Sequence, residues 1–150
     1  MNNSRYQRQQ QVPQLGIESQ QRLSDAHVLI VGAGGLGSPV SLFLAGAGVG
    51  EITLVDHDQV SLSNLHRQIL FNESDVGKPK ATSAQTRLNT LNSEIKINAI
   101  AERLSVTNAE QLISQATVVV DAADNFLVSY LLSDLCFEKR IPLILSLIHI

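Results

Sequence analysis

The chain has 150 residues, 44% of them hydrophobic and 17% charged, which suits one domain with a buried core. Its formal net charge of −3 argues against a general nucleic-acid partner, because such a partner needs a face basic enough to neutralise a run of phosphates. The polar first residues offer no secretory signal and the longest apolar run, 141–150, is too short to span a membrane, so we expect a cytoplasmic protein without a membrane partner.

The first segment, residues 1–26, is a glutamine-rich arm with weak periodicity, in which we predict a short helix over residues 18–24. Arg8 lies in this arm and, judged by spacing alone, is an exposed charge. We therefore treat residues 1–26 as an appendage and residues 27–150 as the domain.

From residue 27 onward the chain alternates between short apolar runs and segments with helical periodicity. This alternation predicts an α/β fold, a Rossmann-like and mainly parallel sheet with helices on both faces, because crossover connections are right-handed. The expected strands are 28–31, 52–55, 94–100, 118–120 and 142–148, and the expected helices are 35–47, 80–91, 108–115 and 126–139.

The first predicted strand runs directly into three spaced glycines, Gly32, Gly34 and Gly37. In dinucleotide-binding folds these positions give a tight turn, a close approach of backbone to phosphate, and close packing of helix on strand. Backbone N–H groups at the start of the next helix then face an anion. The alternative is a tight turn that binds nothing.

An acidic residue follows at the end of the second predicted strand. The Asp56 carboxylate is placed to accept hydrogen bonds from both hydroxyls of a ribose, although it could instead cap a loop or helix. Asp58 is less well placed to bind a ribose, and we expect its carboxylate to be a capping group instead.

A set of polar residues that follows the glycine turn in the sequence narrows the range of possible functions. It comprises Ser63, Asn64, Arg67 and Lys80, each of which alone could be a solvated surface residue. Together they resemble a phosphate-handling set, since fixed cations stabilise the charge that builds on a phosphate under attack, and removing one such donor typically costs about 3–4 kcal/mol. An oxidoreductase has no evident use for such a set.

Two further residues follow the fourth predicted strand, at the sheet edge where open α/β folds bind ligands. Asp124 could hold Mg²⁺ on a triphosphate, or Asp124 and Asn125 could simply cap the next helix; both roles can coexist. The single cysteine, Cys136, excludes an internal disulfide and fits a core position better than a nucleophile.

With these residues in view, the chain resembles the ThiF/MoeB/HesA family, relatives of the ubiquitin-activating enzymes, over about residues 4–145. The block from Ser63 to Gln68, with the later Lys80 and Asp124-Asn125, is far more specific than the glycine turn. The matching segments are SRYQRQ (4–9), GAGGLG (32–37), AGAGVG (45–50), DHDQVSLSNLHRQ (56–68), GKPK (77–80) and DAADN (121–125).

The resemblance implies an ATP- and Mg²⁺-dependent adenylyltransferase that activates the C-terminal Gly-Gly carboxylate of a ubiquitin-like sulfur carrier protein and releases pyrophosphate. It places Gly35 on the nucleotide, Asp56 on the ribose, the 63–67 block and Lys80 on phosphates, and Asp124 and Asn125 on metal and nucleotide. Arg8 matches the arginine that reaches into the neighbouring subunit's site in family dimers. Residues 128–136 look most like the thiamine-pathway branch, with the molybdopterin branch as the alternative.

Family members continue well beyond this length, often with two Cys-x-x-Cys pairs that bind structural zinc, and those ligands are absent from these 150 residues. We therefore expect a C-terminally truncated domain, with an incomplete sheet and an atypical ending after residue 145. Two other functions stay open: a non-catalytic nucleotide-binding remnant, and an NAD-dependent oxidoreductase.

Overall fold

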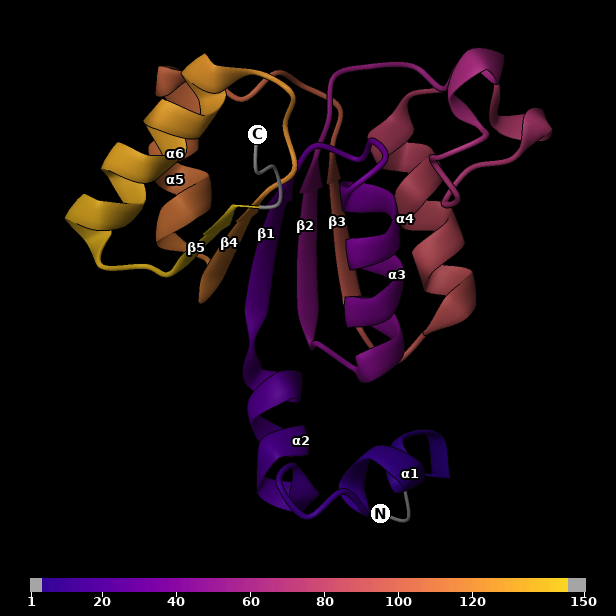
Figure 1. Ribbon diagram of the computed structural model, residues 1–150, viewed down its shortest axis with the longest axis vertical. Coiled ribbons are helices and arrows are strands. Elements are labelled where there is room, and N and C mark those ends of the chain that lie inside the picture. Colours follow the sequence, from indigo (N-terminus) through magenta and orange to yellow (C-terminus); the bar gives the residue numbers. More distant parts are fainter. Residues whose placement is uncertain (1–3, 146–150) are drawn as a thin grey trace.

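The protein is a five-stranded parallel sheet covered by helices on both faces (Figure 1), seen in a computed structural model that describes residues 4–145. The strand order is β3-β2-β1-β4-β5, which confirms the predicted Rossmann-like α/β class. The strands are β1 (His27–Val31), β2 (Glu51–Val55), β3 (Lys96–Ile100), β4 (Val118–Asp121) and β5 (Leu143–Leu145).

Two hydrophobic layers, one on each face of the sheet, hold the helices. On one face, Ala45 of α3 and Leu88 of α4 pack against β1 and β2; on the other, Ile113 of α5 and Leu132 of α6 pack against β1 and β4. Both layers are buried, which explains why the strands read as continuous apolar runs. The helices are α3 (Gly37–Ala47), α4 (Lys80–Leu91), α5 (Val106–Ser114) and α6 (Phe126–Lys139).

The strand order fixes where a ligand can bind. The chain moves outward from β1 through β2 to β3, then returns to place β4 on the other side of β1. The loops that follow β1 and β4 therefore leave the sheet in opposite directions, and open α/β sheets bind ligands at the carboxyl ends of two such strands. The glycine turn follows β1, and residues 122–125 follow β4.

The N-terminal arm is more structured than its composition suggests. It contains a 3-10 turn (Ser4–Tyr6), α1 (Gln7–Gln10) and α2 (Gly16–Asp25), which lie at the amino end of the strands (Figure 1). Tyr6 is buried, and the amides of Gln9 and Gln20 each donate a hydrogen bond of 3.1 Å to the Ala47 carbonyl at the end of α3. These contacts tie the arm to the domain.

Several element boundaries differ from the sequence prediction. Helix α3 begins at Gly37 and not near residue 35, because residues 34–36 still belong to the turn. Helix α5 begins earlier than expected, since Ser105 and Asn108 form a reciprocal capping box at its start. The last strand is observed over 143–145, and the rest of the predicted strand, 146–148, lies outside the described residues. Among residues 4–145 no helix has the length and apolarity needed to cross a membrane.

Candidate functional site

The glycine turn after β1 is shaped by its backbone. Gly32 has φ of 97°, and a Cβ there would lie 2.5 Å from the Ala122 carbonyl oxygen, so the turn after β1 packs directly on the segment after β4. A Cβ on Gly37 would overlap the Gly32 carbonyl oxygen. In the first turn of α3 the Ser38 N–H already donates to the Gly34 carbonyl at 3.0 Å and Pro39 has no N–H, so the Gly37 N–H is the donor of that turn that can face an anion.

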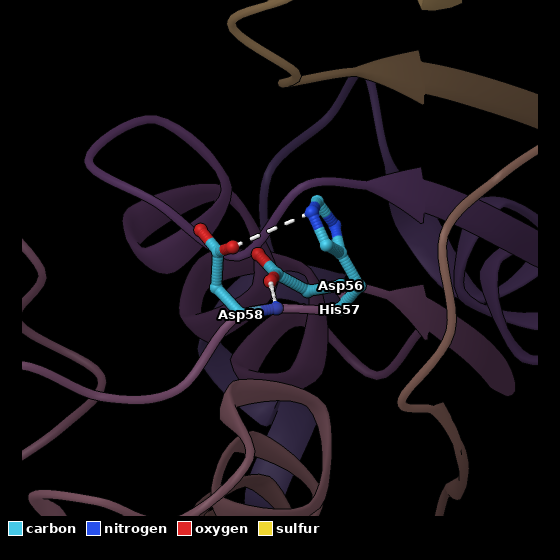
Figure 2. Close-up of side chains that lie close together, drawn as sticks. All are labelled: Asp56, His57 and Asp58. Carbon is cyan, nitrogen blue, oxygen red and sulfur yellow. Dashed lines mark hydrogen bonds and ion pairs between the residues drawn. The ribbon is translucent and has the colours of Figure 1, made fainter.

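Asp56 lies beside this turn and is bonded to it. Its side chain is buried, with Oδ2 accepting from the Ala33 N–H at 2.7 Å and Oδ1 from the Asp58 N–H at 2.8 Å (Figure 2). A carboxylate offers about four lone-pair sites, so both oxygens keep capacity for a further donor such as a hydroxyl. The alternative that Asp56 caps a loop is therefore correct in part, because its Oδ1 accepts from the backbone N–H of Asp58.

The segment 62–68 folds back over the glycine turn and brings a guanidinium to it. The Arg67 Cδ lies 3.4 Å from the position a Cβ on Gly35 would take. Its Nη2 is 3.4 Å from the Asn64 Oδ1, so these two predicted residues share one surface. Ser63 is exposed, and its hydroxyl is 2.9 Å from that of Ser61.

Lys80 starts α4 and has its stem buried, with 5% of the residue exposed. Its Nζ donates to the Asp58 Oδ2 at 3.0 Å, and this hydrogen bond is the main reason that the pKa of the Asp58 carboxyl lies below its usual value. The expectation that Asp58 caps a helix is therefore wrong; it holds the Lys80 ammonium. An ammonium has three donors, so two of them stay available to phosphate oxygens.

The residues after β4 divide between the two roles proposed for them. Asn125 is the N-cap of α6, and its Oδ1 accepts from the Leu127 N–H at 2.9 Å, which confirms the capping alternative for this residue. Asp124 is exposed and follows the segment in contact with Gly32. Its carboxylate thus lies on the solvent side of the carboxyl edge of the sheet.

One predicted site residue is not brought to this edge within a single chain. Arg8 lies on α1, exposed, beyond the amino ends of the strands (Figure 1). Only another chain could use it at the site described above.

Three residues near the site were not singled out by the sequence. Gln68 is 3% exposed, its Oε1 has no hydrogen-bond partner within the described part of the chain, and its Nε2 lies 3.8 Å from a Cβ position on Gly34. Arg103, in the loop after β3, donates from Nη2 to the His57 Nε2 at 2.9 Å. Gln68 could have been identified from the sequence by its place next to Arg67. The pairing of His57 with Arg103 could not, because no pattern in the sequence connects these two residues.

The carboxylates of Asp56 and Asp58 and the imidazole of His57 place ligand atoms within 4.8 Å of one another (Figure 2), which is a spacing that a divalent cation could use. The same oxygens already accept from backbone amides and from Lys80. Cys136 is 2% exposed and its burial raises the pKa of the thiol, so it is a core residue and not a nucleophile.

The comparisons with known proteins agree on one family. The family model for the ThiF family matches residues 6–148. The chain is 46% identical over 145 residues to the sulfur carrier protein adenylyltransferase of Thermus thermophilus, covering 97% of this chain and 54% of that protein. It is 43% identical over 140 residues to the sulfur carrier protein ThiS adenylyltransferase of Escherichia coli, covering 93% and 56%. The chain therefore spans about half the length of these relatives.

Solved structures agree with this result. E. coli MccB with AMPCPP and MccA superimposes with a TM-score of 0.85 at 36% identity, covering 97% of this chain and 44% of that one. The E. coli tRNA N6-threonylcarbamoyladenosine dehydratase in complex with ATP superimposes with a TM-score of 0.84 at 31% identity, covering 95% and 58%.

Proposed function

The chain belongs to the ThiF family, and from this premise we propose that it takes part in ATP-dependent adenylation of the C-terminal Gly-Gly carboxylate of a ubiquitin-like sulfur carrier protein. Two contacts support the proposal: Arg67 lies against the glycine turn at Gly35, and Lys80 bonds to Asp58, whose N–H donates to the Asp56 carboxylate that also bonds this turn. The relatives at 43–46% identity, both named as sulfur carrier protein adenylyltransferases, support the choice of substrate.

The nucleotide would lie across the carboxyl ends of β1 and β2. The triphosphate would contact the turn at Gly34 and Gly35 and the start of α3, where the Gly37 N–H and the positive end of the helix dipole favour an anion. The ribose would bond to Asp56. Arg67 and Lys80 would neutralise phosphate oxygens, with Ser63, Asn64 and Asn125 as polar neighbours of the same edge.

Asp124 would hold a Mg²⁺ ion on the triphosphate. Mg²⁺ binds through one or two carboxylates, phosphate oxygens and water, and the exposed Asp124 carboxylate at the carboxyl edge of the sheet suits that set. The ion, when bound, supplies further neutralisation of phosphate charge.

In the reaction itself, a carboxylate oxygen of the carrier forms a bond to the α-phosphorus, and the bond from that phosphorus to the bridging oxygen breaks. The electron pair of the broken bond leaves with pyrophosphate. Because the attacking group is already an anion, no general base is needed, and the residues act by alignment and charge neutralisation. Arg67 and Lys80 are the side chains whose positive charge serves this purpose.

We also propose a homodimer in which Arg8 completes the partner's site. An apolar hollow on α3 and its neighbours includes Phe43, 77% exposed, and Ile69, 59% exposed, and it is bordered by Gln9 of α1. A second copy packed on this surface would cover it and bring α1 of one chain near the other chain. Light scattering should then show that Phe43→Glu is a monomer. Arg8→Ala should lower the activity but stay a dimer.

Pyrophosphate exchange into ATP, measured with a carrier protein ending in Gly-Gly, tests the activity. Lys80→Ala should lower the exchange rate by about 10²- to 10³-fold, the usual cost of losing one charge-stabilising donor. Lys78→Ala is the matched control, since the Lys78 side chain is 59% exposed and pairs with Asp75 at 3.5 Å. Exchange with a thiamine-type carrier but not a molybdopterin-type carrier would support the thiamine branch.

The same assay separates the competing functions. ATP binding without carrier-dependent exchange would identify a non-catalytic remnant. Binding of NADH in preference to ATP, unaffected by Lys80→Ala, would identify an oxidoreductase. Exchange stimulated by a small-molecule or RNA carboxylate but not by the carrier would point to activation of a different carboxylate.

A further inference from the structure

A paired imidazole and guanidinium, which have no role in the proposed function, lie at the carboxyl edge of the sheet. His57 directly follows Asp56 at the end of β2, and Arg103 belongs to the loop after β3. The Arg103 Nη2 donates to the His57 Nε2 at 2.9 Å. Both residues are exposed, with 46% of the His57 side chain open to solvent, so neither serves the core.

The backbone fixes this pair next to Asp56. Strands β2 and β3 run in parallel with Val55 paired to Ile100, and the Asp56 N–H donates to the Ile100 carbonyl at 3.1 Å. The loop that carries Arg103 therefore begins beside the Asp56 backbone. Figure 2 shows the His57 ring and the Asp58 carboxylate on either side of the Asp56 carboxylate.

The role of this pair rests on the proposed function, in which a nucleotide binds at the glycine turn and Asp56. The phosphates would lie at the β1 turn and the ribose at the end of β2, so the nucleotide extends along the strand order from β1 toward β3. The base, attached to the ribose on the side away from the phosphates, would reach the ends of β2 and β3. His57 and Arg103 are the side chains that meet there.

The chemistry of the pair suits a planar base. Arg103 is always protonated and acts as the donor, so the His57 Nε2 accepts and the ring carries its proton on Nδ1. This bond holds one end of the guanidinium in place, and a fixed guanidinium plane stacks well on aromatic faces. The Asp58 carboxylate is the acidic group facing the pair, with its Oδ1 at 3.5 Å from the His57 Nε2.

We propose that His57 and Arg103 form a stacking platform for the nucleobase, with Arg103 in contact with the base and His57 positioning it. Stacking is tolerant of base identity because every base has a π-face, so the platform adds affinity for the nucleoside part of the ligand without selecting adenine over guanine. Selection between bases would depend on other contacts.

The test compares ligands with and without a base by calorimetric titration in the presence of Mg²⁺. Arg103→Ala should weaken binding of ATP and of GTP by about 5- to 150-fold, the range for losing one stacked base contact. Binding of inorganic tripolyphosphate, which has no base, should stay within about twofold of the unchanged protein, since a distant exposed charge is largely screened. Arg103→Lys should lose nearly as much ATP affinity as Arg103→Ala, because it keeps the charge but not the plane.

Arg87→Ala is the matched control, because Arg87 is an exposed arginine on α4. It should leave all three affinities unchanged. Equal weakening of ATP and tripolyphosphate by Arg103→Ala, or full rescue by Arg103→Lys, would show that Arg103 is a phosphate counter-charge and overturn the platform. ATP binding unchanged in Arg103→Ala would overturn the platform alone, whereas a wild-type chain that binds tripolyphosphate no worse than ATP would remove the nucleotide site and the platform together.

Discussion

Asn92 joins three separate parts of the molecule through one buried amide. It is fully buried directly after α4, where its Nδ2 donates to the Tyr6 Oη at 2.7 Å and to the Ala45 carbonyl at 2.8 Å. Its Oδ1 accepts from the Glu94 N–H at 3.1 Å, in the turn before β3. The arm, the end of α3 and the start of β3 thus meet at this side chain, and Asn92→Ala removes all three bonds.

The size of the effect follows from the number and burial of these bonds. A typical net contribution is about 1 kcal/mol per hydrogen bond, and a buried partner left without a bond costs about 1–3 kcal/mol. The Ala45 carbonyl would keep its bond from the Gly48 N–H at 3.2 Å, whereas the Oη of the buried Tyr6 would lose the bond from Asn92. We therefore expect Asn92→Ala to lower the free energy of unfolding by about 3 kcal/mol, a large share of the roughly 5–15 kcal/mol of a typical domain.

Urea unfolding followed by circular dichroism measures this loss. Asn89→Ala, at an exposed position of the same helix, should change stability by less than about 0.5 kcal/mol. Tyr6→Phe should cost about 1 kcal/mol, and the double variant with Asn92→Ala should cost less than the sum, because the two residues share a bond. An Asn92→Ala protein within about 0.5 kcal/mol of the unchanged chain, with the same urea dependence, would refute the account of the shared amide.

Two further predictions concern titratable groups. The Lys80 ammonium lowers the pKa of Asp58 in the folded state, so the carboxylate adds stability above the ordinary aspartate pKa of about 3.9 that is lost as pH falls through the folded value. Asp58→Asn should therefore flatten the acid side of a plot of unfolding free energy against pH, by less than about 1 kcal/mol because the side chain is 55% exposed; parallel plots would contradict this. Burial raises the pKa of the Cys136 thiol, so the folded protein at pH 8 should react with Ellman's reagent far more slowly than the urea-unfolded chain, and equal rates would show that the thiol is accessible.

The sequence alone determined the elements and their order. Apolar runs such as Val28–Val31 and Val118–Val120 predict buried strands, helical periodicity predicts the segments between them, and the structure confirms each in place. The position of the glycine turn directly after β1 was also readable, because Gly32 and Gly37 tolerate backbone contacts that a Cβ would prevent. Such signals are local, since each depends on a few consecutive residues.

The tertiary structure alone decided which side chains meet. The bond between Tyr6 and Asn92 joins residues 86 positions apart, and the bond from Lys80 to Asp58 gave Asp58 a partner instead of the expected cap. Periodicity says which face of an element is buried, but it does not say which element covers that face or how far along it. Those contacts depend on strand order and register, which are set by packing across the whole domain.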